Sequence, residues 1–394
     1  MINFELKNIP DMIFGRGTEA RCGELLKSFG GTKALIHHSG EPFVQPLIEK
    51  VKGYLTEAGM EFAELGGVVP NPRLSKVYEG IELCRKEKCD CVLAVGGGSV
   101  IDSAKGIACG VPYDGDVWDM YRMVVTPEKV LTLGVISTFS GTGSECSCAS
   151  VVTNEKTQLK LSIDDNPLVR PAFCILNPEL TYSVPPMQTA SGASDIMSHL
   201  VENFCTATPD VYMNHQFLIA GMKTVLKNAP IAVREPDNYA ARSALAATAP
   251  FAISGLLRIG LVGDWACHLM EHEMSTEWNV PHGLGLAIIT PVWMRYVYKR
   301  NVNLFAKLAV ELFGIEYDFD CPERTALAGI DALSEWFQSI GMPRTIREFV
   351  DGDTSEATLR RMAARIDYPL EGHKTGFAFA ISAEDVVNIY KLAL

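Results

Sequence analysis

The first half of the chain alternates short apolar runs with amphipathic stretches. Lys33–His37 and Cys89–Val95 have the length and composition of buried strands. Phe43–Ala58 repeats its apolar residues at the spacing of one helical face, and Ser75–Glu87 reads as a second helix. Alternation of this kind is typical of a parallel sheet covered by helices. We therefore predict an α/β fold here, with further strands over Glu61–Val69 and Leu131–Ser137 and a β-hairpin over Ser150–Asp164.

The periodicity changes near Pro185, and from Met187 onward it is helical almost throughout. The predicted helices cover Gln188–Cys205, Val211–Lys227, Tyr239–Leu257, Gly263–Thr276 and several segments up to Leu394. A chain of 394 residues also exceeds the size at which a single core stops growing. We predict two domains, an α/β domain over 1–185 and an all-α domain over 186–394.

Composition and charge narrow the function classes. The net charge of −12 disfavours nucleic acid and anionic membrane as partners. The most apolar segment, Phe251–Met270, carries Arg258 and Asp264, which disfavours a membrane span. The eleven cysteines follow no framework spacing, and the first residues lack the features of a signal peptide. We expect a cytoplasmic protein with reduced thiols.

Two residue pairs in the helical half have the spacing of one helical turn. Asp195 and His199 lie four apart, as do His268 and His272, so each pair leaves its helix on one face. His282 stands between a proline and a glycine. One carboxylate and several imidazoles that converge on a point bind iron or zinc. Such pairs also arise by chance on helices, so spacing alone leaves a metal site and ordinary packing equally open.

Two glycine-rich segments follow predicted strands. Gly96–Gly98 leads into a helix that begins near Ser99, an arrangement whose backbone N–H groups can bind a diphosphate. The alternative is a capping box made by Ser99 and Asp102. Thr138–Glu145 alternates hydroxyl residues with glycine and suits a polar ligand, although a capped turn explains it equally well. Because both segments end parallel strands, we expect them to line one site.

Together these motifs resemble the iron-containing (group III) alcohol dehydrogenase family. The resemblance rests on GGGSVIDSAK over 96–105, TFSGTGSE over 138–145, the paired spacings above and the GMPRT segment over 341–345. The chain looks closest to the NADPH-dependent butanol and aldehyde-reducing members. The resemblance implies a dehydroquinate-synthase-like fold and a homodimer. It also implies hydride transfer between NAD(P)(H) and a small primary alcohol or aldehyde.

The resemblance carries specific roles onto this chain. The implied ligands of one Fe²⁺ or Zn²⁺ ion are Asp195, His199, His268 and His282. Diphosphate binding is implied for Gly97, Gly98 and Ser99, with Asp102 nearby, and the nicotinamide and ribose side for Thr138, Thr142 and Lys160. We predict that His272 is a catalytic histidine that does not bind the metal and passes a proton towards solvent. The alternative is that it packs against the nicotinamide.

The segment after the strand that ends at His37 departs from the family pattern. Its sequence is His38-Ser39-Gly40-Glu41-Pro42. The family usually has either an aspartate that holds the adenosine ribose of NAD or a Gly/Ser-rich run that admits the NADP phosphate. Because no aspartate is present, and Ser39 and nearby imidazoles suit a 2′-phosphate, we lean towards NADP. The carboxylate of Glu41 argues for NAD.

Two other functions compete with the dehydrogenase. A lyase of the dehydroquinate-synthase type shares the fold, NAD and metal, but it needs lysine or arginine around an acidic substrate. The surroundings of the predicted ligands are instead apolar and acidic, with Glu202, Glu271 and Glu273. The other alternative is a non-catalytic metal or nucleotide binder. The sequence favours the dehydrogenase.

Overall fold

The computed structural model describes residues 1–4, 10–163, 166–366 and 374–394. Its internal contacts form two compact units. The sheet unit holds the chain up to Val184 together with Ala249–Ser254. The helical unit holds Pro185–Thr248 and Gly255–Leu394, together with the first residues of the chain. The division at Val184 lies next to the boundary expected from sequence, but the exchange of Ala249–Ser254 has no counterpart in that prediction.

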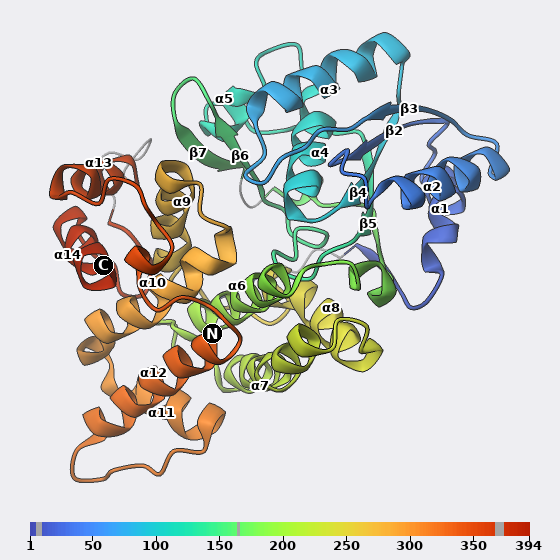
Figure 1. The fold of residues 1–394 in the computed structure, drawn as a ribbon. Helices are drawn as coiled ribbons and strands as arrows, with labels where there is room; N and C mark the ends of the chain where they lie inside the picture. The colour runs from blue at the N-terminus through green and yellow to red at the C-terminus, as the bar shows by residue number, and fades with distance from the viewer. Residues whose placement is uncertain (5–9, 164–165, 367–373) are drawn as a thin grey trace. The chain divides into compact units, whose positions relative to one another are not determined.

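A six-stranded parallel sheet forms the centre of the sheet unit, in the order β1-β8-β5-β4-β2-β3 (Figure 1). The strands are β1 (Asp11–Phe14), β2 (Lys33–His38), β3 (Glu61–Leu65), β4 (Cys91–Gly96), β5 (Thr132–Ser137) and β8 (Phe173–Leu176). Because all neighbouring pairs are parallel, their carboxyl ends meet at one edge. That edge is where the glycine-rich segments begin, with Gly96 opposite Ser137.

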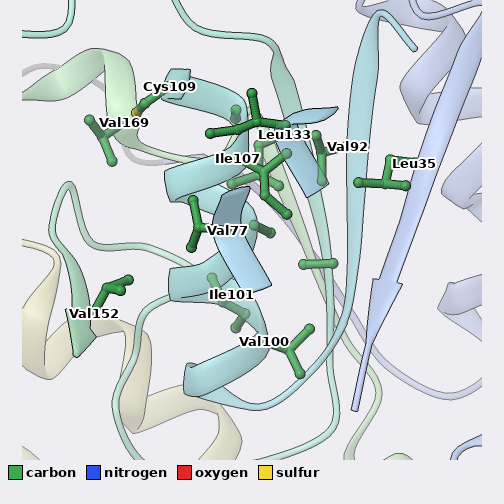
Figure 2. Packing of buried hydrophobic residues seen from close by; sticks show 14 of the residues in the cluster. Leu35, Val77, Val92, Val100, Ile101, Ile107, Cys109, Leu133, Val152 and Val169 are labelled. Atoms are coloured by element: carbon green, nitrogen blue, oxygen red, sulfur yellow. The ribbon is translucent and has the colours of Figure 1, made fainter. Parts of the chain in front are cut away.

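Helices cover both faces of this sheet (Figure 1). On one face lie α1 (Cys22–Ser28) and α2 (Gln45–Glu57), and on the other α3 (Leu74–Glu87), α4 (Gly98–Gly110) and α5 (Trp118–Tyr121). Successive strand residues point to opposite faces. Leu35 belongs to a cluster with Val77 and Ile107 (Figure 2), whereas Ile36 belongs to a second cluster with residues of α1 and α2. Every residue of β4 is buried, which explains its continuous apolar sequence.

The α/β prediction is confirmed, and its errors concern short elements and boundaries. The predicted hairpin is confirmed as β6 (Ser150–Asn154) and β7 (Leu159–Ile163), although its last residue, Asp164, lies outside the described residues. Strands β1 and β8 were not predicted, because four residues give too little pattern to recognise. The strand expected over Glu61–Val69 ends at Leu65. The strand expected from Cys89 starts at Cys91.

The helical unit surrounds one buried helix, α6 (Pro186–Phe204), which packs against α7, α9 and α10. The others are α7 (Tyr212–Arg234), α8 (Tyr239–Ile253), α9 (Ala266–Trp278), α10 (His282–Val297), α11 (Val302–Phe313), α12 (Pro322–Ser339), α13 (Glu356–Ile366) and α14 (Ala383–Ala393). Only the part of α8 up to Thr248 belongs to this unit. Helix α7 runs further than predicted, through Pro230. Helix α8 ends earlier, at Ile253, and α9 begins later, at Ala266. No helix in the described ranges is long and apolar enough to cross a membrane.

Candidate metal centre and dinucleotide segments

Three helices of the helical unit bring the predicted metal ligands together. Helix α6 carries Asp195 and His199 one turn apart, and α9 carries His268. His282 is the first residue of α10, directly after the N-cap residue Pro281. Asp195, His199 and His268 are all nearly inaccessible to solvent.

One oxygen atom lies at the centre of the group. Asp195 Oδ1 is 3.6 Å from Nδ1 of His199, 3.6 Å from Nε2 of His268 and 3.7 Å from Nε2 of His282. These separations are too long for hydrogen bonds. The ring of His199 stacks on that of His268 with centroids 4.4 Å apart. The three-residue group of Asp195, His268 and His282 has its ligand atoms within 4.8 Å of one another, and His199 stands beside it.

Three polar atoms in this group have no hydrogen-bond partner among the described residues. They are Asp195 Oδ1, His199 Nδ1 and His268 Nε2, and all are buried. A buried polar atom without a partner costs about 1–3 kcal/mol, so three that converge on one point require an explanation. A divalent cation would satisfy all three atoms at once. One carboxylate oxygen with imidazole nitrogens is also a donor set that iron and zinc accept.

Two fully buried glutamates bind the Nδ1 atoms of His268 and His282. Glu202 binds Nδ1 of His268 with one oxygen and accepts the backbone N–H of Cys267 at 2.7 Å with the other. Glu271 binds Nδ1 of His282, and its other oxygen accepts from Ser275. With each Nδ1 occupied, both rings turn Nε2 towards Asp195.

The sequence showed Glu202 and Glu271 only as acidic residues near the ligands, and their contact with the rings was missed. The signal was available in their spacing. Glu202 lies one turn beyond His199, and Glu271 lies three residues beyond His268. Both positions place a carboxylate on or beside the face that carries the ligands. Which ring each carboxylate meets depends on how the helices pack, so spacing alone could not assign the pairs.

The charges of the site are those of a cation-binding pocket. Burial would raise the pKa of Asp195, but the surrounding imidazoles, led by His199, hold it well below its usual range. Burial lowers the pKa of His199 to about 3. Burial would also lower the pKa of His268, but Glu202 and Asp195 outweigh it and raise that pKa to about 10. The carboxylates therefore stabilise positive charge at the position of the His268 ring.

His272 lies one turn beyond His268 on α9 and is partly exposed. Its ring centroid is 5.6 Å from that of His282. It belongs to a separate group of possible ligand atoms with Glu271 and His282, and not to the group around Asp195. The structure thus places His272 next to the predicted metal ligands and outside their closest cluster.

In the sheet unit, Gly97 is the N-cap residue of α4, and no side chain caps the helix. The capping-box interpretation of Ser99 and Asp102 is therefore wrong, because both residues lie inside the helix. The glycines do have a packing role. A Cβ on Gly98 would stand 2.5 Å from Thr142 Oγ1, and one on Gly97 would stand 3.0 Å from Phe139. The second glycine-rich segment therefore rests directly on the first.

The remaining predicted cofactor residues lie either near the carboxyl edge of the sheet or on the β6–β7 hairpin. Thr142 accepts the backbone N–H of Ser144 at 3.2 Å in a turn, a contact that the capped-turn alternative also predicts. Thr138 follows β5 and Ser39 follows β2, both at the carboxyl edge of the sheet. Lys160 is buried on β7 and donates to Asn71 Oδ1 at 3.0 Å. Asn71 is a contact that the sequence analysis missed.

The fold and the histidine cluster define the class of protein, and comparison with known families agrees. Residues 10–178 match the model of "Iron-containing alcohol dehydrogenase", and residues 189–394 match "Fe-containing alcohol dehydrogenase family, C-terminal". The chain belongs to the iron-containing alcohol dehydrogenase family. The predicted membership and the predicted fold class are both confirmed.

Individual relatives span the whole chain. It is 37% identical over 394 residues to a probable NADH-dependent butanol dehydrogenase 2 of Bacillus subtilis, covering 100% of both sequences. It is 29% identical to the NADPH-dependent aldehyde reductase YqhD of Escherichia coli, covering 92% of this chain and 93% of the other. The crystal structure of NADH-dependent butanol dehydrogenase A from Thermotoga maritima superposes with a TM-score of 0.93 at 35% identity, covering 100% and 99%. This chain is accordingly an NAD(P)-dependent oxidoreductase that interconverts alcohols and aldehydes.

Proposed function

We propose that the chain interconverts a small primary alcohol and its aldehyde, with one Fe²⁺ or Zn²⁺ ion held by Asp195, His199, His268 and His282. The observation that carries this proposal is the convergence of buried, unpartnered ligand atoms around Asp195 Oδ1. When bound, such an ion supplies Lewis acidity at the oxygen of the alcohol or aldehyde. Asp195 contributes one negative charge at that point, which leaves a divalent ion with net positive charge there.

Glu202 and Glu271 act as positioning residues in this proposal. Each fixes the tautomer and orientation of one histidine ring through its Nδ1. Both glutamates are fully buried, so solvent does not compete for the contacts. The rings are thereby held with Nε2 available before any ion arrives, which reduces the conformational entropy lost on binding.

His272 is proposed to accept and release a proton at an imidazole nitrogen without binding the ion. Its place beside His282, outside the Asp195 cluster, supports this role. We expect His272→Ala to retain its metal and to lose roughly 10²-fold in kcat. The measurement combines elemental analysis with steady-state kinetics. Unchanged kcat with a weaker cofactor KM would show a packing residue, and loss of metal would show a ligand.

The dinucleotide is proposed to bind at the carboxyl edge of the sheet. There the N–H groups of Gly98 and Ser99 begin α4 at the positive end of its helix dipole, which suits a diphosphate. The residues proposed to contact it are Ser39, Gly97, Gly98, Ser99, Asp102, Thr138, Thr142 and Lys160. Support comes from the position of Ser39, Gly97 and Thr138 directly after β2, β4 and β5, and from the packing of the two glycine-rich segments on each other.

We propose NAD(H) as the preferred cofactor, which departs from the lean towards NADP drawn from the sequence. The imidazole of His38 is already occupied, because Nε2 contacts Glu64 at 3.0 Å and Nδ1 accepts from Gly40 at 3.0 Å. The nearby cation of Lys52 is paired with Glu64 at 2.7 Å. Glu41 is exposed at the start of the next segment. A 2′-phosphate would meet carboxylates here, and the names of the Bacillus and Thermotoga relatives also favour NADH.

The cofactor preference is tested by kcat/KM with NADH and with NADPH. We expect NADH to be favoured, and Glu41→Ser to improve NADPH use by roughly tenfold, because it removes a like charge from the phosphate. Glu49→Ser, on the exposed side of α2, serves as the control for a general change in surface charge. A wild-type preference for NADPH would overturn the proposal.

We also propose a homodimer that works in the cytoplasm. All eleven cysteines are free thiols and most are buried, which suits a reducing compartment.

The whole proposal is tested on purified protein by elemental analysis and a panel of aldehydes with either nucleotide. We expect bound iron or zinc and oxidation of NADH by short-chain aldehydes. A protein that binds metal and nucleotide but oxidises neither nucleotide with any aldehyde would be a non-catalytic binder.

A further inference from the structure

The ammonium group of Lys105 lies in the interior of the sheet unit, on α4, and has no exposure to solvent. Five oxygen atoms surround its Nζ at hydrogen-bond distance. Three are backbone carbonyls, of Ser144 at 2.7 Å, Ser147 at 3.0 Å and Ala149 at 2.7 Å. Two are the hydroxyls of Ser144 at 2.9 Å and Ser147 at 3.0 Å. All of them belong to the segment 144–149, which overlaps the last two residues of the second glycine-rich segment, Thr138–Glu145.

This geometry resembles the coordination of a cation by a loop. Three carbonyls of one short segment point inward at a single atom, which places their negative ends close together. Without a positive charge at the centre, these carbonyls would repel one another and lose the hydrogen bonds that Nζ donates. The segment 144–149 forms no helix or strand. Within it, the carbonyl of Ser144 also accepts the backbone N–H of Ser147 at 3.3 Å, and that of Ala149 accepts the Ser147 hydroxyl at 3.2 Å. Nζ of Lys105 is the donor that joins all three carbonyls. Its conformation therefore depends on Lys105.

Two further hydrogen bonds link the segment 144–149 and the adjacent Ser150 to α4. The hydroxyl of Ser144 donates to Asp102 Oδ1 at 2.6 Å, and Ser150 Oγ donates to the carbonyl of Asp102 at 2.8 Å. Asp102 and Lys105 lie one turn apart on α4 and supply opposite charges to the segment. The helix thus provides both an acceptor and a donor for a segment that has little regular structure of its own.

The glycine-rich segment is held between these two anchors. Thr142 lies against Gly98 at the start of α4, and Ser144 is bound to both Asp102 and Lys105. Any movement of 144–149 would therefore shift Thr142 relative to the first N–H groups of α4. Those are the groups to which the proposed function assigns the diphosphate.

We propose that Lys105 is a positioning residue for the dinucleotide, acting as an internal cation around which the segment 144–149 folds. It does not contact the nucleotide in this proposal. It fixes the position of the Thr138–Gly143 segment on the N-terminus of α4. The inference rests on the proposed dinucleotide site and deepens it.

The first test uses Lys105→Met, which keeps the length of the side chain and removes the charge and the donors. We expect the variant to fold and to keep the metal content of the wild type, because the proposed ligands all lie in the helical unit. We expect the Kd for NADH, measured by nicotinamide fluorescence, to rise at least tenfold. Amide hydrogen exchange over 138–150 should also become faster. An unchanged Kd in the folded variant overturns the inference.

A matched control separates positioning from general destabilisation. Ile107→Ala removes another fully buried side chain of α4, one that packs against α3. It should lower the melting temperature without a comparable change in the Kd for NADH. Equal losses of NADH affinity in Ile107→Ala and Lys105→Met, at equal loss of stability, would show that Lys105 only stabilises the fold.

Chemical rescue gives the sharpest readout. In Lys105→Ala the missing part of the side chain leaves room for a primary alkylammonium ion. We expect propylammonium chloride to restore part of the NADH affinity, and sodium chloride or tetramethylammonium chloride at the same concentration to restore none. Equal effects of all three salts count against the inference, because tetramethylammonium carries the charge but cannot donate hydrogen bonds.

Ser147→Ala keeps the test decisive if the lysine variants fail to fold. It removes one hydroxyl acceptor of Nζ and leaves the charge and the carbonyls in place. A several-fold rise in the Kd for NADH, with wild-type metal content, supports the inference, and an unchanged Kd overturns it. Wild-type protein that binds no nicotinamide nucleotide would instead refute the proposed function. Faster exchange over 138–150 in Lys105→Met would then still show that Lys105 holds the segment.

Discussion

The two units each bury a cluster of charged groups, and the clusters differ in how their atoms are satisfied. Around Asp195, three buried ligand atoms have no hydrogen-bond partner among the described residues. Around Lys105, five oxygens lie within hydrogen-bond distance of one ammonium group. Unsatisfied buried atoms cost free energy and persist where a ligand repays the cost. A buried charge whose hydrogen bonds are formed stabilises the local structure instead.

The elements that carry the clusters differ as well. The metal centre is assembled from α6, α9 and the first residue of α10, so rigid helices hold the ligands. The oxygens around Lys105 come from a segment without helix or strand. Helices can keep the histidines in place when no ion is bound, and the glutamates behind the rings assist them. A segment of irregular backbone has few hydrogen bonds of its own, so its conformation depends more on the groups that it binds.

The largest effect is expected from His268→Ala. It removes a ring whose Nε2 lies 3.6 Å from Asp195 Oδ1 and whose Nδ1 is held by Glu202. We expect loss of most bound metal and nearly all turnover, measured by elemental analysis and NADH oxidation. His215→Ala on α7 is the control, because that ring bonds to the carbonyl of Phe204 away from the cluster. Normal turnover without bound metal in His268→Ala would show that the group around Asp195 is not a catalytic metal site.

A smaller effect is expected from Glu202→Gln. The amide retains the size of the side chain but removes the negative charge behind His268. Loss of such a partner typically lowers metal affinity 10–100-fold. The measurement is competition for the ion with a chelator of known affinity. Glu273→Gln, a buried glutamate on the same α9 whose carboxylate pairs with Arg365, should change affinity far less. Equal metal affinity in wild type and Glu202→Gln would make the glutamate a packing residue.

The smallest predicted effect concerns stability and pH in the sheet unit. His37 is fully buried between the carbonyl of Leu65 and the hydroxyl of Ser103. Burial lowers its pKa from 6.5 to about 3. Between these values the unfolded chain binds a proton that the folded protein does not, so stability falls as the pH falls. From pH 7 to pH 5 this contribution is about 2 kcal/mol.

The test compares variants by the slope of their unfolding free energy against pH. Unfolding free energies of metal-free protein at pH 7 and pH 5 should differ less in His37→Gln than in wild type, whatever the absolute loss of stability. Ser103→Ala is the control, since it removes a partner of the ring but leaves the titrating group. Its slope should stay close to that of the wild type. Identical slopes in wild type and His37→Gln would show that another group carries the acid dependence.

Much of the fold followed from the sequence because its longer elements have strong patterns. The buried run of β4 and the amphipathic stretches of α2 and α3 carry their periodicity within the element itself. Strands β1 and β8 have four residues each and were missed, since such short runs become strands only by pairing with neighbours.

The sequence by itself determined which residue types could serve the chemistry and which helix faces carried them. Asp195 with His199, and His268 with His272, share faces because the helical period is a local property. Only the tertiary structure decided that Asp195 Oδ1 lies between three rings, that Glu202 and Glu271 stand behind two of them, and that Lys105 meets five oxygens. Those contacts join residues distant in the chain. Their geometry comes from packing, which no local pattern encodes.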